Sequence, residues 1–282
     1  MIVAVTGSSG FIGSRLVAKL KTNNHELIEL DIQTGFDVLD YNQMKTVRKF
    51  DVCIHLAALT FVPLSFEVPH DFYMLNTHGL INCIELCRLH DARMIFASSY
   101  VYGQPHYLPI NEDHPLEGLN PYTETKILGE TICANYFKYF GVKSIILRPF
   151  NVYGQGQNEK FLLPSILNQA KNGKIKLNDP RPKRDFVFVD DVVDCYVKAV
   201  ENNNIPFDVF NIGSGKSYSV SEVVGMVNEL YGNTLDVEFS NQERVIEVFD
   251  TVADISKVKL GLDWSPKTDL FEGIKKILHA NG

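Results

Sequence analysis

The chain has 282 residues, of which 45% are hydrophobic and 22% charged, an ordinary composition for a globular protein. This length suffices for one large α/β unit or for a core domain with a smaller lobe. The net charge of −7 comes without a basic block, which argues against nucleic acid as the main partner. Because no apolar run approaches the length of a membrane-spanning helix, we expect no membrane partner.

The cysteines and the N-terminus bear on the compartment. The five cysteines form no CxxC pair, are odd in number and have apolar neighbours, which is typical of reduced core residues. The chain begins directly in a predicted strand, so we expect no signal peptide. We therefore predict a cytoplasmic protein, and we expect no metal site because no His or acid pattern accompanies the cysteines.

The first residues predict a strand, a glycine turn and a helix. Residues 2–5 form a short apolar run, and after Gly7, Gly10 and Gly13 apolar residues recur at helical spacing. Gly7 permits a tight turn, Gly10 lets the backbone approach a diphosphate, and Gly13 lets the helix pack closely on the strand. The helix N-terminus would then point N–H groups at the anion. A βα turn without a ligand is the alternative.

The second predicted strand, residues 27–30, ends at Asp31. An acid at this distance from a glycine turn is suited to bind ribose hydroxyls. The next three residues, Ile-Gln-Thr, supply no cation for a 2′-phosphate, so NAD is favoured over NADP. A turn cap is the alternative role for Asp31.

Strands and helices then alternate, which predicts a doubly wound parallel sheet. Further strands are expected at residues 51–56, 93–97 and 143–147, with helices at 75–89 and 120–139. After residue 154 prolines and longer loops predict a smaller lobe. The expected domains are a nucleotide-binding core at 1–154, resuming at 186–204, and a lobe formed by 155–185 and 205–282.

Tyr122 and Lys126 lie one helical turn apart on a predicted helix. A phenol with its ordinary pKa of about 10 is a poor base at neutral pH. A neighbouring ammonium lowers that pKa, so the pair can take a proton from a sugar hydroxyl while a hydride leaves for NAD. The hydroxyl of Ser98, at the end of the strand 93–97, could bond the same oxygen. An exposed helix face and a serine-rich turn are the alternatives.

In combination, these motifs resemble the extended short-chain dehydrogenases/reductases of the nucleotide-sugar epimerase/dehydratase family. The similarity covers nearly the whole chain and implies an α/β fold with a Rossmann-type doubly wound parallel sheet and a smaller C-terminal substrate lobe. The matching segments are, in order, Thr6–Gly13, Asp37 with Val38, His55–Ala58, Asn76 with Gly79, Ser98–Gly103, Tyr122 with Lys126, Arg148–Gly154, Arg184–Asp190 and Asn211–Gly215.

The resemblance implies roles for individual residues. Tyr122 would be the catalytic acid or base, Lys126 would bind the nicotinamide ribose and lower the pKa of Tyr122, and Ser98 would be the hydroxyl partner. The expected NAD contacts are Gly7, Gly10, Phe11, Ile12, Gly13, Asp31, Asp37, Val38, Leu56, Ala57, Ala58, Asn76, Tyr122, Lys126, Pro149 and Val152. The expected contacts to the nucleotide-diphosphate sugar are Ser98, Ser99, Tyr122, Asn151, Arg184 and Arg244.

At one pair of positions the sequence differs from part of the family, and this difference indicates the type of reaction. Dehydratases of the family carry an Asp-Glu pair where this chain has Ser99 and Tyr100, which argues against a 4,6-dehydratase. We expect an NAD-dependent C4 epimerase that acts through a 4-keto intermediate, with an NAD(P)H-dependent 4-keto-6-deoxy-sugar reductase as the alternative. A non-catalytic scaffold would usually lack the tyrosine or the lysine. We also expect a homodimer, paired through the helices 75–89 and 120–139, and leave the base and the sugar open.

Overall fold

The core of the protein is one parallel sheet. The computed structural model describes residues 1–240, 242 and 248–280. Six strands lie in the order β2-β1-β3-β4-β5-β9, and all five pairings are parallel. Their bounds are β1 Ile2–Thr6, β2 Glu26–Leu30, β3 Val52–His55, β4 Arg93–Ala97, β5 Ser144–Pro149 and β9 Phe207–Ile212. Their apolar runs suit strands that are covered on both faces.

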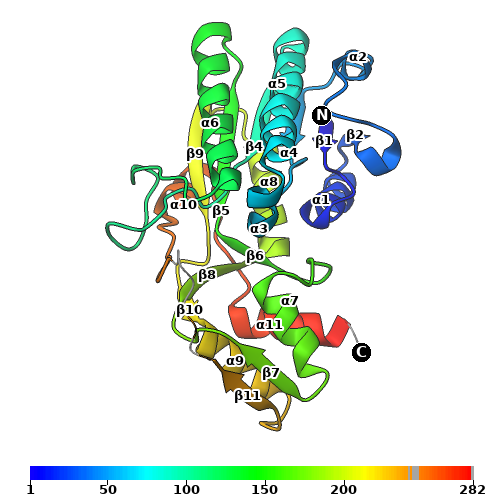
Figure 1. The fold of residues 1–282 in the computed structure, drawn as a ribbon. Coiled ribbons are helices and arrows are strands. Elements are labelled where there is room, and N and C mark those ends of the chain that lie inside the picture. The colour runs from blue at the N-terminus through cyan, green and yellow to red at the C-terminus, as the bar shows by residue number, and fades with distance from the viewer. Residues whose placement is uncertain (241, 243–247, 281–282) are drawn as a thin grey trace.

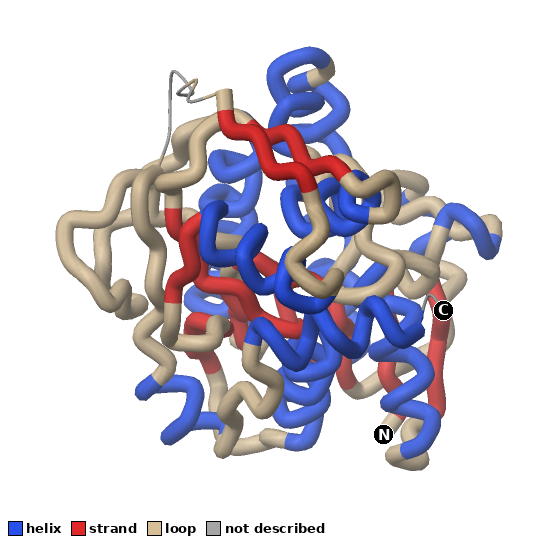
Figure 2. Tube along the Cα trace, turned by 90° about the horizontal axis from the view of Figure 1, so that it is seen from below, coloured by secondary structure: helices blue, strands red, loops and turns tan. Residues whose placement is uncertain are grey.

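Helices cover both faces of this sheet (Figure 1). On one face α1 (Phe11–Thr22) packs against α8 (Val189–Glu201), and both contribute to one apolar cluster with the strands. On the other face α5 (Gly79–His90) lies beside α6 (Pro121–Phe140) over a second cluster. Figure 2, seen from below, shows the helices packed around the strands. The predicted doubly wound, Rossmann-type sheet is confirmed.

Short elements connect the outer strands to these helices. They include η1 (Ile32–Thr34) and α2 (Tyr41–Met44) after β2. Between β3 and α5 lie α3 (Val62–Glu67), α4 (Pro69–Tyr73) and the π-helical turn η2 (Met74–His78), so the predicted helix 75–89 begins as a π-turn.

A third apolar cluster, made of helices and short strands, forms the lobe (lower part of Figure 1). Its sheets are β10-β8-β6 and β11-β7, and its core is formed largely by three helices. The bounds are β6 Asn151–Tyr153, α7 Leu162–Ala170, β7 Lys174–Leu177, β8 Lys183–Phe188, β10 Ser217–Ser219, α9 Val220–Leu230, β11 Asp236–Phe239 and α11 Leu270–Ala280.

The structure corrects the expected domain boundaries. β9 was assigned by sequence to the lobe, but it pairs with β5 along its whole length as the sixth strand of the central sheet. The helix α10 (Ser256–Leu262) and Trp264 also pack in the core cluster. Conversely, residues 186–188 were expected in the core but form the end of β8, which pairs with β6 and β10; Phe186 and Phe188 pack in the lobe and Val187 in the core cluster. Strand pairing between segments distant in sequence decides these boundaries. The local pattern of apolar and polar residues does not predict such pairing.

The five cysteines are buried and free, in agreement with the predicted core cysteines. Across the described ranges, no helix is both long enough and apolar enough to cross a membrane.

Candidate active site

The glycine turn between β1 and α1 is built to approach a ligand with its backbone. Gly7 has φ +66°, a conformation that favours glycine, and a Cβ there would lie 2.8 Å from the backbone N of Ala57. A Cβ on Gly13 would lie 2.0 Å from the Gly7 carbonyl oxygen. Gly10 is the N-cap of α1, where no described side chain caps the helix and no acid occupies the first turn. The backbone N–H groups in the first turn of α1 are therefore suited to bind the diphosphate of NAD.

Asp31 lies beside this turn at the end of β2. Its Oδ2 accepts a hydrogen bond from the backbone N–H of Ser9 (3.0 Å), and its Oδ1 accepts one from Gln33 (2.9 Å). The residue therefore caps η1, as the alternative reading held, and it also holds a carboxylate against the glycine loop. Because each carboxylate oxygen has a further lone pair, the arrangement fits the hydroxyls of a ribose bound there.

The other predicted NAD contacts are distributed along the same edge. Phe11, Ile12, Asp37, Leu56, Ala57, Ala58 and Val152 are partly exposed, whereas Val38, Asn76 and Pro149 are buried. Leu56 N–H donates to the Thr6 carbonyl (3.2 Å), which keeps the end of β3 beside the glycine turn. The Asn76 amide donates to Leu59 O (3.0 Å) and to Thr125 Oγ1 (2.9 Å), so it ties the loop after β3 to α6.

Tyr122 and Lys126 project from the first turns of α6. The helix begins where the Asn120 side chain accepts a hydrogen bond from Thr123 N–H, with Pro121 as its first residue. Lys126 is 3% exposed, and its Nζ donates to Ala97 O (2.8 Å) and lies 5.9 Å from the centroid of the Tyr122 ring. Burial lowers the pKa of Lys126 to about 8, although nearby Glu130 and Cys133 act to raise it.

The structure brings Ser99, not Ser98, to Tyr122. Ser98 is 3% exposed, and its Oγ donates to Glu130 Oε1 (2.5 Å) in the interior. The Ser99 side chain instead lies near the Tyr122 phenol and acts to lower its pKa. Because successive side chains of extended backbone point to opposite sides, only one of two adjacent serines can face the site. In the structure Ser98 therefore faces Glu130, and Ser99 is the serine that lies toward Tyr122; which hydroxyl binds the substrate stays a prediction.

A second correction concerns the Tyr122 phenol. We expected Lys126 to lower its pKa, but in the structure burial raises the pKa of Tyr122, and only Ser99 opposes this. The physical reason is that desolvation penalises the phenolate, while the Lys126 ammonium is directed at the Ala97 carbonyl.

The predicted substrate residues come from the lobe and its junction with β5. Asn151 Nδ2 donates to Asp185 O (3.3 Å). Arg184 Nη1 donates to the carbonyl oxygens of Lys183 (2.8 Å) and Val248 (2.5 Å), and its charge acts on the Tyr100 phenol. Arg244 lies outside the described residues.

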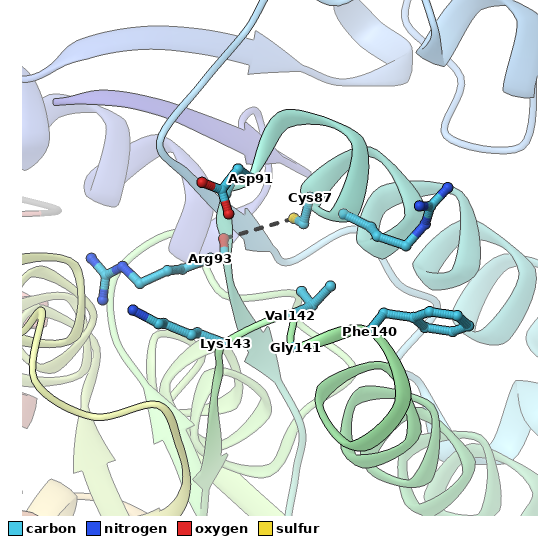
Figure 3. Close-up of a pocket in the computed structure, with 9 residues that line it drawn as sticks. Cys87, Asp91, Arg93, Phe140, Gly141, Val142 and Lys143 are labelled. Atoms are coloured by element: carbon cyan, nitrogen blue, oxygen red, sulfur yellow. Dashed lines mark hydrogen bonds between the residues drawn. The ribbon is translucent and has the colours of Figure 1, made fainter.

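A surface depression lies at the opposite edge of the sheet (Figure 3). Cys87, Arg93, Phe140 and Lys143 are among the residues that line it, and Cys87 Sγ donates to Arg93 O (3.7 Å). Because β4 begins at Arg93 and β5 just after Lys143, this depression marks the amino ends of the strands. The catalytic side chains lie beyond the carboxyl ends, where ligands of such sheets bind.

Comparison with known proteins decides the family. The sequence model of the NAD dependent epimerase/dehydratase family matches residues 3–213. This chain belongs to that family.

Relatives of this epimerase/dehydratase chain match over nearly its whole length. A putative UDP-glucose 4-epimerase of Methanocaldococcus jannaschii is 34% identical, with 99% of this chain and 97% of the relative covered. The UDP-glucose 4-epimerase of Thermotoga maritima, solved with UDP-glucose, is 26% identical with a TM-score of 0.92, covering 100% and 99% of the two chains. That of Thermus thermophilus, solved with NAD, is also 26% identical, with a TM-score of 0.88 and the same coverage.

These findings confirm several predictions from sequence. The family, the use of NAD as cofactor and the assignment as a nucleotide-sugar C4 epimerase are confirmed, and the keto-sugar reductase is not favoured. Sequence reasoning missed Glu130 as the partner of Ser98. Its position one turn beyond Lys126 was the available signal.

Proposed function

We propose that this family member interconverts the C4 epimers of a UDP-hexose and retains NAD through the cycle. The observation that carries the proposal is the set formed by Tyr122, Ser99 and Lys126, beside a glycine turn suited to a dinucleotide. The nucleotide is proposed to be UDP because the relatives named above act on or bind UDP-glucose.

The reaction follows from these side chains. Tyr122 accepts the proton of the C4 hydroxyl, while Ser99 holds the same oxygen through a hydrogen bond and fixes its direction. For this step Tyr122 must be present as the phenolate. The Lys126 ammonium, 5.9 Å from the centroid of the ring, would supply the positive charge that favours this form against the burial that raises the Tyr122 pKa. The glycine turn after β1 would hold NAD, which would supply the hydride acceptor and donor for C4, with the keto-sugar turned over between the two transfers. Tyr122 then gives its proton back to the keto oxygen.

Substrate binding is proposed to use the lobe. Arg184 would hold the diphosphate, since a guanidinium forms paired hydrogen bonds to phosphate oxygens, and Asn151 would contact the sugar. We retain Arg244 as a second candidate for the diphosphate. The division into an NAD-binding core and a sugar-binding lobe belongs to the same proposal.

The test is Tyr122→Phe. We expect the kcat for UDP-glucose epimerisation to fall by about 10²- to 10⁴-fold, the usual contribution of a general base. Ser99→Ala should lower kcat, whereas Tyr107→Phe, which alters an exposed phenol bonded to Asn111, should leave it unchanged. Turnover of Tyr122→Phe at the wild-type rate would refute the assignment. Stoichiometric loss of absorbance at 340 nm when NADH and a keto-sugar are supplied would favour the reductase instead.

We also propose that the enzyme is a cytoplasmic homodimer that pairs through α5 and α6. These neighbouring helices carry several exposed apolar side chains, namely Ile81, Leu89, Leu128, Tyr139 and Phe140. A contiguous exposed apolar surface is typical of an interface. Sedimentation velocity at micromolar concentration should give a dimer, and Leu128→Glu should weaken it. A monomer in the wild type would contradict the proposal.

A further inference from the structure

The Glu130 carboxylate forms a buried ion pair beneath the catalytic residues. Glu130 is 6% exposed and Arg148, on β5, is 4% exposed. Arg148 donates from Nε to Oε1 (2.8 Å) and from Nη2 to Oε2 (2.5 Å). The Ser98 hydroxyl donates to the same Oε1. Three donors therefore converge on one carboxylate, the arrangement that compensates a charge removed from water.

The pair belongs to a longer hydrogen-bond network. Arg148 Nη1 also donates to Tyr102 Oη (2.8 Å), and this hydroxyl donates to Asn211 Oδ1 on β9 (2.5 Å). Asn211 Nδ2 in turn donates to Ile110 O (2.9 Å). The network links α6, the end of β5 and β9, so it fixes the backbone that surrounds the site.

One end of β4 is joined to α6 at three successive turns. The Ala97 carbonyl accepts from Lys126, the Ser98 hydroxyl donates to Glu130, and the Ser99 side chain lies near Tyr122. The contacted helix positions, 122, 126 and 130, are four residues apart and share one face. The bond of Ser98 to Glu130 therefore determines that the next side chain, Ser99, points toward the phenol.

The same carboxylate is also the nearest negative charge on the helix face of Lys126. Lys126 carries a buried charge, and Glu130 is the first of the groups that favour its protonated form. The other titratable or charged groups around the two residues are Tyr122 and Cys133 on α6, His55 on β3, Arg148 on β5 and Tyr102 after β4. His55 supplies no competing charge, since burial lowers its pKa to about 3.

We propose that Glu130 is a positioning residue for the reaction, which directs Ser99 at Tyr122 through Ser98 and, one turn along the same helix face, sets its negative charge beside the Lys126 ammonium. Its geometric part rests on the proposed function, whereas its effect on the charge of Lys126 does not. Glu130 touches neither substrate nor cofactor in this scheme. Glu130 acts through its hydrogen bond to Ser98 at the end of β4 and through the electrostatic field of its carboxylate.

Two substitutions separate charge from geometry. Glu130→Gln removes the charge, so the proton should leave Lys126 at lower pH, and the alkaline limb of the kcat–pH profile should move down by about one pH unit. The Lys126 resonance of ε-13C-lysine-labelled apoprotein, assigned with Lys126→Met, should shift its titration by the same amount. Glu130→Asp keeps the charge but is too short to hold both partners. We expect it to leave that titration in place and to lower kcat about tenfold, with less change in KM.

Controls distinguish positioning from simple stability. Asp191→Asn alters another buried carboxylate, on α8 across the sheet, and should destabilise the fold without moving the Lys126 titration. Should Glu130→Gln fail to fold, Ser98→Ala keeps the ion pair and should still lower kcat, with the titration unmoved. The proposal is overturned if the Lys126 titration is unchanged in Glu130→Gln. It is also overturned if Glu130→Asp and Ser98→Ala lose activity only in proportion to the unfolded fraction.

The readouts also separate this inference from the epimerase assignment. If Tyr122→Phe turned over normally, the proposed function would fail while the NMR shift in Glu130→Gln could still be observed. If the NMR titration did not move while Tyr122→Phe was inactive, the role of Glu130 would fail and the catalytic assignment would stand.

Discussion

At the scale of single residues, the site depends on a lysine whose burial lowers the stability of the fold. Lys126 is almost fully buried, and desolvation lowers its pKa from 10.5 to about 8. Its bond to Ala97 O and the charge of Glu130 offset only part of that cost. An ordinary core position would carry an apolar side chain, so the retained ammonium indicates selection for chemistry and not for stability.

We predict that Lys126→Met stabilises the apoprotein while it abolishes turnover. A lysine whose folded pKa lies below its unfolded value destabilises the fold below about pH 8, and the penalty is lost as pH rises toward 10.5. Allowing for the lost bond to Ala97 O, the gain at pH 7 should be about 2 kcal/mol. Urea unfolding at pH 7 and pH 10 measures it. Exposed Lys138 on the same helix gives the control, Lys138→Met. A gain that does not shrink at pH 10 would contradict the explanation.

At the scale of elements, the same residue type serves two purposes in two helices. Gly13 in α1 has no room for a Cβ, because the Gly7 carbonyl lies 2.0 Å from its position. Gly225 in α9 is exposed, and no described atom lies within 4 Å of a Cβ placed there. The first glycine is required by close packing at the nucleotide turn, and the second is a helix position that any good helix former can fill.

The two glycines make a matched pair of predictions. Gly13→Ala should push α1 off the turn, cost about 1–3 kcal/mol as overpacking does, and weaken NAD binding. Gly225→Ala should stabilise the protein by up to about 1 kcal/mol, the difference in helix propensity, and leave NAD binding unchanged. Thermal unfolding and calorimetric titration with NAD give both readouts. Equal effects of the two substitutions would show that the turn geometry is not what requires Gly13.

At the scale of the whole molecule, one buried carboxylate joins segments that are far apart in sequence. Asp185 in β8 is fully buried. Its Oδ1 accepts from Ser214 N (2.6 Å) and Oγ (2.7 Å), and its Oδ2 accepts from Gly215 N (3.0 Å) and Ala253 N (3.0 Å). Burial raises the pKa of Asp185, which the four hydrogen bonds counteract. This residue fixes the lobe strand β8 to the loop that follows β9.

Replacement of this carboxylate should loosen the lobe more than the core. For Asp185→Asn we predict a loss of about 2–3 kcal/mol, because an amide cannot accept from all four donors. We also expect a larger loss of affinity for UDP than for NAD, measured by calorimetry. Asp190→Asn, which alters an exposed ion pair with Arg15, should cost less than about 1 kcal/mol. Equal weakening of both ligands by Asp185→Asn would contradict a local effect on the lobe.

Much of the site could be predicted because its parts are local in sequence. The glycine turn, Asp31 at the end of its strand, and the four-residue spacing of Tyr122 and Lys126 follow from backbone geometry over a few residues. The order of these motifs along the chain also indicated the family to which the protein belongs. The alternation of apolar strands and amphipathic helices likewise predicted the parallel sheet.

The tertiary structure alone decided the features that depend on what surrounds a residue. It turned Ser98 inward to Glu130 and Ser99 toward Tyr122, it raised the pKa of Tyr122 through burial, and it placed β9 in the central sheet. The desolvation of a side chain and the pairing of a strand both depend on neighbours that come from distant parts of the sequence. They therefore cannot be predicted from the spacing of residues along the chain. The sequence motifs thus determined the type of chemistry, whereas tertiary packing determined which of the two adjacent serines lies toward Tyr122.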